Sequence, residues 1–326
     1  MPQAKLSNIN KPIENELDKF NQFFRDSLKS KVGLVDLVTR YILKQKGKKI
    51  RPLLVLLASK VCGGVSERSF RGSVLVELLH TATLVHDDVV DGAETRRGLP
   101  SINAVWKNKI SVLMGDYLLA RGLMIAVEGD DFDFLKTITQ TVKRMSEGEL
   151  LQISKTRKLD NDEETYYRII SDKTASLLET CCEIGARAAT DDPQKIEAMR
   201  LFGLSLGIAF QIRDDILDYT GKTNIIGKPL GGDIKEKKLT LPLIYSLKKA
   251  DKSEAGRIIK LIKSGRKKGR IKEVIEFVIN MGGIDYAENA ALEHAEKAKS
   301  SLSIFEDSES RSSLINLVDF VIQRKN

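Results

Sequence analysis

Apolar residues recur at every third or fourth position along most of this 326-residue chain, which is the spacing of amphipathic helices. Leu17, Phe20 and Phe24 open the series. The pattern predicts a helix that begins near Pro52, and helices over residues 14–29, 34–43, 69–91, 104–128, 132–155, 163–189, 193–219, 241–247, 254–264, 267–281, 285–305 and 308–323. Because the chain has only 7 Pro and 23 Gly and is rich in strong helix formers, the predicted fold class is all-α.

The helical pattern continues without a low-complexity linker or an internal repeat, so we expect one domain over residues 1–326. The N-terminal residues lack the apolar core of a signal peptide, and no apolar run reaches the roughly 18 residues of a membrane span. Three cysteines, Cys62, Cys181 and Cys182, have no metal-site spacing and are interpreted as reduced packing residues. These features predict a cytoplasmic protein.

The predicted helix over residues 69–91 changes abruptly from apolar to ionic in its last turn. Asp87 and Asp91 lie one turn apart on one face, and Asp88 adds a third carboxylate. His80, two turns earlier, lies within about 20° of Asp87 and Asp91 around the helix axis. An apolar helix that ends in clustered carboxylates is the first unusual feature of the sequence.

The predicted helix over residues 193–219 ends in the same D-D-x-x-D pattern. Gln211, Asp215 and Asp218 share a face there, and Asp214 borders it. Like charges at the C-terminal end of a helix repel one another and face the negative end of the helix dipole, so a cation should compensate them. Carboxylate oxygens are hard ligands, which favours Mg²⁺. The alternative, a solvated acidic face, is weakened because the pattern occurs twice.

Cationic residues accompany the acidic clusters and could contact phosphate oxygens. Arg96 and Arg97 follow the first cluster, and further candidates are Lys48, Lys49, Arg51, Lys173, Lys222, Lys228, Lys237 and Lys238. The distal run SGRKKGR, residues 264–270, is interpreted as ordinary surface charge. The net charge is +8. Because the basic residues fall beside acidic clusters, we do not expect the protein to bind nucleic acid.

Seven sequence blocks match, in order, the motifs of the trans-polyprenyl diphosphate synthases, the all-trans isoprenyl diphosphate synthases of long-chain type. The blocks are GKKIRP, ELLHTATLVHDDVVDGAETRRG, GDYLLARG, EGELLQ, DKTASLLE, FGLSLGIAFQIRDDILDYTG and GKPLGGDIKEKKLTLP. The chain therefore resembles this family over nearly its whole length. One departure is that the family's E-G-K reads Glu236-Lys237-Lys238 here, so a flexible Gly is lost.

The resemblance implies an all-α bundle, usually a homodimer, with the two aspartate helices facing each other across a central cavity. It implies an Mg²⁺-dependent prenyltransferase, with three ions per active site. The enzyme would join isopentenyl diphosphate to an allylic diphosphate and make a long-chain all-trans polyprenyl diphosphate for a quinone side chain. The product would pass to a membrane.

The resemblance also implies a role for each motif residue. Metal ligation, direct or through water, falls to Asp87, Asp88, Asp91, Asp214, Asp215 and Asp218. The residues implied to hold the allylic diphosphate are Arg96, Lys173, Lys228 and Lys238. Those implied to hold isopentenyl diphosphate are Lys48, Arg51, His80 and Arg97. Thr174 and Gln211 could turn oxygens toward the allylic carbocation. The basic C-terminal tail, Arg324 and Lys325, either folds over the site or frays.

Product length in this family depends on the residues four and five positions before the first aspartate, where an aromatic side chain closes the product tunnel. Thr83 and Ala82 occupy these positions here. Neither blocks a tunnel, so we expect a hexaprenyl to octaprenyl product. The alternatives are that small residues here only allow close helix packing, and that the enzyme is a shorter-chain farnesyl or geranylgeranyl diphosphate synthase.

Three other functions are considered. A class I terpene cyclase normally carries a different second metal motif and needs no second diphosphate pocket. A non-catalytic partner subunit of a heterodimeric synthase typically loses aspartates, and none is missing from these motifs. A nucleic-acid-binding protein is disfavoured by the interleaved charges. The sequence therefore favours a catalytic prenyl diphosphate synthase.

Overall fold

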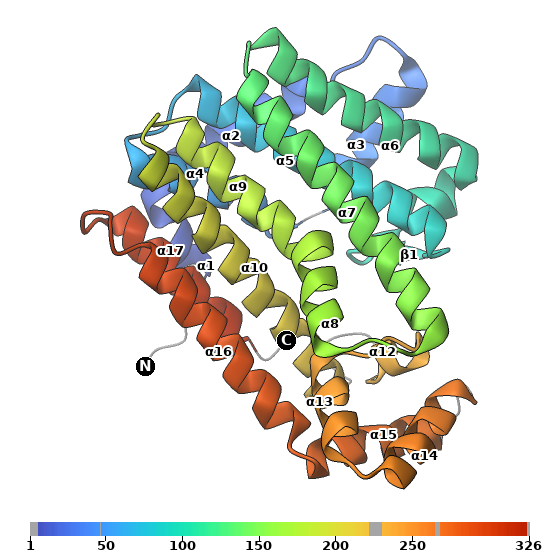
Figure 1. Cartoon of the computed structure of the whole chain (residues 1–326). Helices are drawn as coiled ribbons and strands as arrows, with labels where there is room; N and C mark the ends of the chain where they lie inside the picture. The colour runs from blue at the N-terminus through green and yellow to red at the C-terminus, as the bar shows by residue number, and fades with distance from the viewer. Residues whose placement is uncertain (1–5, 46, 222–229, 265–267, 325–326) are drawn as a thin grey trace.

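The computed structural model describes residues 6–45, 47–221, 230–264 and 268–324, and the described chain is almost entirely helical (Figure 1). The α-helices are α1 (Leu6–Asn10), α2 (Glu14–Ser27), α3 (Gly33–Lys44), α4 (Ile50–Cys62), α5 (Glu67–Val90), α6 (Ile102–Glu128), α7 (Phe132–Lys158), α8 (Glu163–Ile170), α9 (Ser176–Arg187), α10 (Pro193–Thr220), α12 (Gly232–Lys235), α13 (Leu241–Lys249), α14 (Lys252–Lys263), α15 (Lys268–Asn280), α16 (Gly283–Ser301) and α17 (Glu309–Gln323). The predicted all-α fold class is confirmed.

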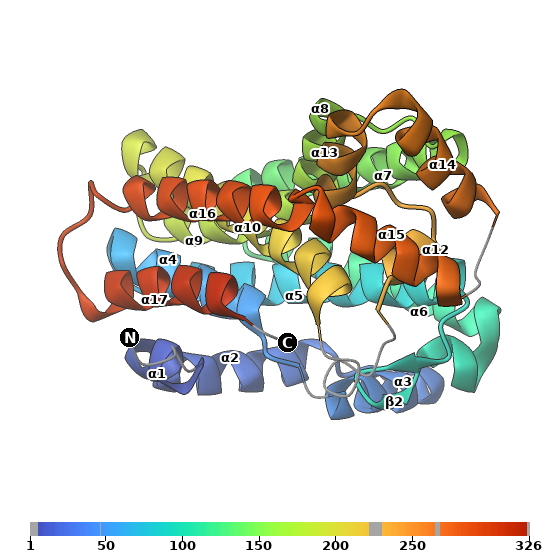
Figure 2. The same ribbon diagram turned by 90° about the horizontal axis from the view of Figure 1, so that it is seen from below.

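The helices stack in layers (Figure 2). In that view α2 and α3 lie below α4, α5 and α6, while α9, α10 and α16 lie above them. Neighbours along the stack pack extensively: α5 on α6, α4 on α9, and α10 on both α9 and α16. The long helices α5 and α10, which carry the two aspartate clusters, are therefore interior elements of the bundle.

Two groups of buried apolar side chains form the core. The first lies between α4, α5, α6, α7 and α9 and includes Leu54, Val76 and Phe134. The second lies around the C-terminal half of α10 and α13 to α16 and includes Ile216 and Val278. Because α10 contributes side chains to both groups, this helix joins the two halves of the bundle.

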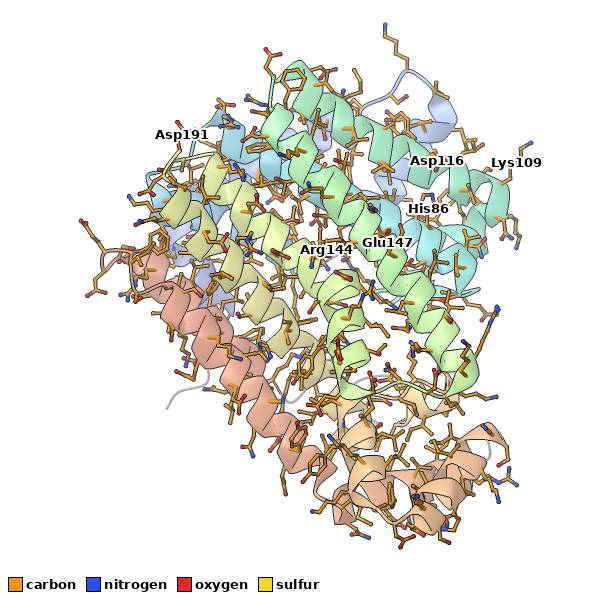
Figure 3. The ribbon with its side chains drawn as sticks, viewed as in Figure 1. His86, Lys109, Asp116, Arg144, Glu147 and Asp191 are labelled. Atoms are coloured by element: carbon orange, nitrogen blue, oxygen red, sulfur yellow. The ribbon has the colours of Figure 1, made fainter. Side chains whose placement is uncertain are left out.

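Small residues let α5 and α6 approach closely. Gly115 of α6 faces the ring of His86, and Gly122 faces the side chains of Leu75 and Leu78, so a larger residue at either position would press on α5. Figure 3 shows His86 beside Asp116 of α6, and their side-chain atoms are 3.3 Å apart. Among the helices of the described residues, only α6 is long and apolar enough to cross a membrane, judged by its length and composition alone. It is also a core helix of the bundle, packed along α5.

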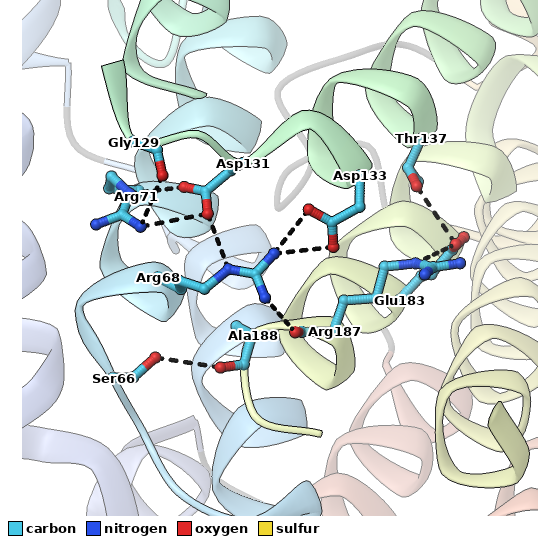
Figure 4. A network of polar contacts seen from close by, with 10 residues as sticks. All are labelled: Ser66, Arg68, Arg71, Gly129, Asp131, Asp133, Thr137, Glu183, Arg187 and Ala188. Atoms are coloured by element: carbon cyan, nitrogen blue, oxygen red, sulfur yellow. Dashed lines mark hydrogen bonds and ion pairs between the residues drawn. The ribbon is translucent and has the colours of Figure 1, made fainter. Parts of the chain in front are cut away.

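A polar network closes the end of the bundle where α5 begins (Figure 4). Arg68 donates from Nε to Asp131 at 2.8 Å, from a terminal nitrogen to Asp133 at 2.7 Å, and to the carbonyl of Arg187 at 2.9 Å. Arg71 donates from Nε to the other oxygen of Asp131 at 2.6 Å. The network therefore ties the start of α5 to the α6–α7 turn and to the end of α9.

Among the local features that differ from the sequence prediction, three lie near the aspartate clusters. The helix predicted over residues 163–189 is interrupted by a π-helical segment, Ser171–Ala175, between α8 and α9. The segment between the helices predicted over residues 69–91 and 104–128 contains two short antiparallel strands, β1 (Thr95–Arg96) and β2 (Leu99–Pro100). Positive φ angles at Arg97 and Gly98 allow the tight turn between these strands. The short helix α12 was not predicted, because four residues are too few for a periodic pattern.

Candidate active site

The three aspartates of the first cluster have different environments. Asp87 and Asp91 are exposed at the C-terminal end of α5. Asp88 is only 3% exposed, and its carboxylate accepts a hydrogen bond of 2.9 Å from Nε of Arg96. Strand β1 places Arg96 there. Asp87 and Asp91 are therefore open to a ligand, while Asp88 is neutralised within the protein.

Burial and charges of both signs act on Asp87. Partial burial raises the pKa of Asp87, and the nearby carboxylates of Glu149 and Asp91 raise it further, while Lys173 and Arg96 act in the opposite direction. The Lys173 ammonium lies 2.5 Å from Glu149. Glu149, which comes from α7, was not singled out from the sequence, although the EGELLQ block contains it. The cluster thus lacks a full complement of positive charge.

The second cluster is centred on the buried carboxylate of Asp215, which is 4% exposed. It accepts hydrogen bonds from the hydroxyl of Tyr166 at 2.7 Å and from the amide of Gln211 at 2.8 Å. Burial, with the charge of Asp233 second, raises the pKa of Asp215 to about 7. Tyr166 and Asp233, from α8 and α12, were not singled out from the sequence, although the GKPLGGDIKEKKLTLP block contains Asp233.

Asp218 and Asp233 are linked through the start of α12. The Asp218 carboxylate accepts from the backbone N–H groups of Gly232 and Asp233, at 2.9 and 3.0 Å. Burial raises the pKa of Asp233 to about 6, and the charge of Asp218 adds to this shift. Asp218 therefore fixes the position of the segment that carries Asp233.

Asp214 lies on a different side of α10 from Asp215. Its carboxylate forms an ion pair with the guanidinium of Arg324, near the C-terminus. The same guanidinium stacks over the ring of Phe210 with 4.7 Å to the ring centre, and the Arg324 carbonyl accepts from Arg213 at 3.1 Å. Of the two predicted tail residues, Arg324 thus reaches the aspartate cluster, while Lys325 lies outside the described residues.

The π-helical segment presents Lys173 and Thr174 to the second cluster. Thr174 donates from its hydroxyl to the Gln211 side-chain oxygen at 3.0 Å. Gly148 of α7 and Gly207 of α10 lie against the segment so closely that a side chain on either would collide with its backbone. A π-helical turn inserts an extra residue and is often found at functional sites. Two glycines on neighbouring helices therefore leave room for this turn.

A pocket of about 150 Å³ lies between α7, the π-helical segment, α10 and the chain after α12. It brings together five predicted site or cluster residues: Lys173, Thr174, Gln211, Asp215 and Lys238. Lys238 is also 2.5 Å from Glu236 and 4.0 Å from Asp233. The pocket therefore holds carboxylates and ammonium groups side by side, as a site for a metal-bound diphosphate requires.

A second pocket of about 230 Å³ is lined by Lys48, Lys49, Ile50, Arg51, Glu77, His80 and Arg97. It contains all four residues that the family resemblance implied for isopentenyl diphosphate. The Nε atom of Arg51 is buried and has no hydrogen-bond partner in the described structure. Burial and the charges of Arg51 and Arg97 lower the pKa of His80 well below its usual value, so the imidazole is neutral at pH 7. Such a pocket suits an anion.

Glu77 at the base of this basic pocket was missed from the sequence. It is 7% exposed, and burial raises its pKa while the charges of Arg51, Arg97 and Lys49 lower it. In the sequence Glu77 is a lone acid inside an apolar run, although it is also the first residue of the ELLHTATLVHDDVVDGAETRRG block. Its carboxylate offsets part of the positive charge of the pocket.

In the loop before α13, Lys237 stands where the family has a glycine, and its backbone conformation is one that suits glycine. Lys237 has φ of 60°, a left-handed conformation that glycine adopts without strain. The N–H of Lys238 donates to the carbonyl of Asp233 at 2.8 Å, which keeps Lys238 beside the pocket. Loss of the glycine therefore leaves Lys238 in position. Lys222 and Lys228 lie outside the described residues.

The two predicted chain-length residues face different surroundings. Ala82 is 2% exposed and belongs to the first core group. Thr83 is partly buried and donates to the carbonyl of His80 at 2.9 Å. Below them Leu75, which is fully buried, faces Gly122 of α6. An aromatic side chain at position 82 would therefore project into the apolar core below Asp87.

The donor set fits Mg²⁺. Among the described residues no three carboxylate, imidazole or thiolate groups already converge as a metal site. Asp87 and Asp91 nevertheless offer exposed oxygen ligands one helical turn apart, and burial, together with the charges of Glu149 and Asp91, raises the pKa of Asp87. Hard oxygen ligands beside Lys and Arg are typical of sites in which Mg²⁺ is shared with phosphate oxygens. A divalent cation would relieve the repulsion.

Comparisons with known proteins agree with this geometry. The sequence model of the polyprenyl synthetase family matches residues 33–278. The chain is 37% identical to an all-trans-nonaprenyl-diphosphate synthase (geranyl-diphosphate specific) of Rhodobacter capsulatus, over 96% of each chain. It is 34% identical to an octaprenyl diphosphate synthase of Haemophilus influenzae, over 98% of this chain and 97% of that one.

A solved structure extends the comparison to the fold. The chain superposes with a TM-score of 0.91, at 33% identity and over 100% of both chains, on a polyprenyl synthase of Caulobacter crescentus CB15 in complex with calcium and isoprenyl diphosphate. The family match covers most of this chain, and the relatives match over nearly their full lengths. The chain therefore belongs to the polyprenyl synthetase family and is a trans-prenyltransferase that makes long-chain polyprenyl diphosphates.

Proposed function

We propose that this enzyme elongates an allylic diphosphate with isopentenyl diphosphate to a hexaprenyl to octaprenyl product, with three Mg²⁺ ions per active site. The observation that carries the proposal is the pair of pockets on the two aspartate helices. One contains basic residues around His80, and the other combines Asp215 and Asp233 with Lys173 and Lys238. Two diphosphates of different roles need two such environments.

The basic pocket would bind isopentenyl diphosphate. Arg51 and Arg97 would donate to its phosphate oxygens, and Lys48 would add a third positive charge. The neutral imidazole of His80 can donate one hydrogen bond without adding positive charge. In this position the double bond of isopentenyl diphosphate would point toward the C-terminal end of α5, where the allylic substrate binds.

The allylic diphosphate would bind between the two aspartate clusters, held by Arg96, Lys173 and Lys238. Asp87, Asp91 and Asp214 would hold Mg²⁺, with Asp88, Asp215 and Asp218 in direct or water-mediated support, and the bound ions would supply electrostatic stabilisation of the leaving pyrophosphate. Arg96 and Asp214 already have protein partners, Asp88 and Arg324, so these pairs must loosen or be shared when the substrate binds.

The reaction breaks the allylic C–O bond and forms one C–C bond. The pyrophosphate leaves with the bonding electron pair, and the double bond of isopentenyl diphosphate attacks the allylic carbocation. The proton that is then lost passes to the departing pyrophosphate. The Gln211 side-chain oxygen accepts a hydrogen bond from the Thr174 hydroxyl at 3.0 Å, and these oxygens would stabilise the positive charge that develops on the allylic carbon. Apolar side chains below Asp87 exclude water, which would otherwise quench the carbocation.

The enzyme is proposed to act in the cytoplasm, as one domain and as a homodimer. Apolar side chains exposed on the outer face of α6 and α7 support the dimer; they are Val105, Val112, Leu113, Met124, Val127, Phe132, Leu150 and Ile153. Exposed apolar surface of this kind commonly marks a protein interface. The two core groups joined by α10 support a single cooperative domain.

Product analysis tests the proposed function. Purified protein is incubated with Mg²⁺, isopentenyl diphosphate and farnesyl diphosphate, with an EDTA control, and the products are identified by mass spectrometry. An EDTA-sensitive ladder that ends at hexaprenyl to octaprenyl diphosphate is expected. Absence of elongation by folded protein, with other allylic starters also tried, would favour a non-catalytic partner subunit. Hydrocarbon products would indicate a cyclase.

The substitution Ala82→Tyr tests the product tunnel. Its phenol would project into the apolar space below Asp87, so the ladder should end several isoprene units earlier. Because one helical turn rises about 5.4 Å, close to the reach of one isoprene unit, the shortening reports how much of the tunnel is lost. The control Ala82→Ser keeps a small side chain and should leave product length unchanged. An unchanged ladder in folded Ala82→Tyr would contradict the tunnel.

A further inference from the structure

The net positive charge of the chain is concentrated in a single segment. Residues 248–272 contain eleven Lys and Arg against two Asp and Glu, a net charge of +9, whereas the whole chain carries +8. The rest of the chain is therefore nearly neutral. The segment spans the end of α13, all of α14 and the start of α15. It extends well beyond the run at residues 264–270 that the sequence suggested was ordinary surface charge.

Helix α14 sorts its residues into a buried face and a basic face. Ile258 and Ile262 are buried against the second core group. On the other side Lys252, Lys260 and Lys263 lie within about 80° of one another around the helix axis, and all three are exposed. The exposed Lys248 at the end of α13 extends the same region in sequence. These four residues are called the lysine face below.

The lysine face is not used to stabilise the fold. No side-chain hydrogen bond or ion pair joins any of its four lysines to another described residue, whereas the neighbouring Arg257 is held by Glu254 and Glu273. Four exposed ammonium groups close in sequence repel one another unless an anion is nearby. The lysine face therefore lowers the stability of the unbound protein and is suited to bind an anionic partner.

The lysine face lies at the end of the molecule that carries the second aspartate cluster. Helix α15 packs against α12, and Gly231 lies against Ile271 and Ile275 of α15. The N–H of Gly231 in turn donates to the carbonyl of Asp218 at 2.9 Å. Figures 1 and 2 show α14 and α15 together at the edge of the bundle, near α12. A surface bound there would be close to the second aspartate cluster.

We propose that the lysine face docks the enzyme on an anionic lipid bilayer, with the second aspartate cluster close to the bilayer surface. The proposal rests on the function above, because a long polyprenyl chain is insoluble in water and has to enter a membrane. Each Lys near an anionic bilayer strengthens binding by about 1 kcal/mol, or roughly fivefold. Several such lysines give reversible, salt-sensitive binding, which lets the enzyme return to soluble substrates.

Vesicle flotation without substrates tests the docking. Full-length protein is mixed with vesicles of phosphatidylcholine, with or without phosphatidylglycerol, at several salt concentrations. Binding is expected only with phosphatidylglycerol and is expected to fall as salt rises. The triple variant Lys252→Glu, Lys260→Glu, Lys263→Glu should bind at least tenfold more weakly, and the corresponding Lys→Gln variant should show a smaller loss.

The matched control changes three exposed lysines on the other side of the molecule, Lys11→Glu, Lys19→Glu and Lys31→Glu, with the same change in net charge. It should keep most of the binding. An equal loss in both triple variants would show that net charge alone acts, and would overturn the proposal. Absence of vesicle binding by the unmodified protein, or displacement from vesicles by transfer RNA at equimolar phosphate, would also overturn it, the latter in favour of nucleic acid.

Elongation measured without vesicles separates this proposal from the proposed function. Both triple variants should keep kcat within twofold of the unmodified enzyme, because none of the six lysines lines either pocket. Circular dichroism confirms that each variant is folded. Loss of vesicle binding with normal elongation supports docking, whereas vesicle binding by a protein that cannot elongate would leave docking intact and contradict only the proposed function.

Discussion

The two ends of the bundle use the same kinds of side chain in opposite ways. At the end where α5 begins, the carboxylates of Asp131 and Asp133 are matched by Arg68 and Arg71 (Figure 4). At the aspartate end, defined by the C-terminal ends of α5 and α10, acidic groups crowd together, and the pKa values of Asp215 and Asp233 are raised to about 7 and about 6.

This difference separates a structural role from a functional one. A buried carboxylate with full partners contributes to a defined fold, because removing a partner leaves a charge in a poor environment. A carboxylate that is crowded by like charge lowers the stability of the metal-free protein and keeps affinity for a cation. We therefore expect substitutions at the two ends to have opposite effects on stability and on activity.

The largest expected effect is at the aspartate end. Asp87→Asn should lower kcat at least about 10³-fold, because it removes a carboxylate that is proposed to hold Mg²⁺ against the leaving pyrophosphate. Its free energy of unfolding should stay the same or rise, since the pKa of Asp87 is raised in the folded protein. Steady-state kinetics and urea unfolding measure both quantities. The exposed control Asp18→Asn should change neither, and an active Asp87→Asn enzyme would contradict the assignment.

At the end where α5 begins, a substitution should lower stability and leave activity unchanged. Arg68→Met should lower the free energy of unfolding by about 2–3 kcal/mol, because Asp133 loses its partner and Asp131 keeps only Arg71. Activity per folded molecule should be unchanged. The control Arg40→Met removes an exposed pair with Asp36 and should cost less than about 0.5 kcal/mol. Equal losses in the two variants would mean that the network carries no special stability.

The raised pKa values at the aspartate end predict a dependence of stability on pH. Folded Asp215 holds a proton up to about pH 7, whereas the unfolded chain releases it near pH 3.8, so folding takes up a proton between these values. The contribution of Asp215 is therefore greatest at low pH and is lost as pH rises toward 7. In EDTA buffer, Asp215→Asn should gain about 2–4 kcal/mol relative to the unmodified protein between pH 4.5 and 7.5. If the free energies of unfolding of the two proteins changed in parallel between these pH values, the pKa of Asp215 would not be raised.

The smallest expected effect concerns two residues with a left-handed backbone conformation, one at each end of the bundle. Asp130, in the α6–α7 turn, has φ of 56°, and Lys237 at the aspartate end has φ of 60°. Asp tolerates this conformation better than Lys does. Lys237→Gly should therefore raise the free energy of unfolding by about 0.5 kcal/mol, and Asp130→Gly by less. Urea unfolding measures both, and a loss of stability in Lys237→Gly would show that its left-handed backbone is not strained.

Local pattern predicted most of the helices, because each buries one periodic face. It failed where neighbouring helices decide the backbone. The helix predicted over residues 163–189 contains a π-helical turn that fits because Gly148 and Gly207 leave room for it. Neither glycine is near that helix in the sequence, so no local pattern could reveal the interruption.

The sequence by itself determined the fold class, the two aspartate helices, and the grouping of Lys48, Arg51, His80 and Arg97, because these depend on helical periodicity and on motif order. Only the tertiary structure decided which carboxylates are exposed and which are paired. Asp88 meets Arg96 across a turn, Asp215 meets Tyr166, and Asp214 meets Arg324 from the far end of the chain. The physical reason is that desolvation and charge pairing depend on neighbours in space, and helical spacing specifies only neighbours on the same helix.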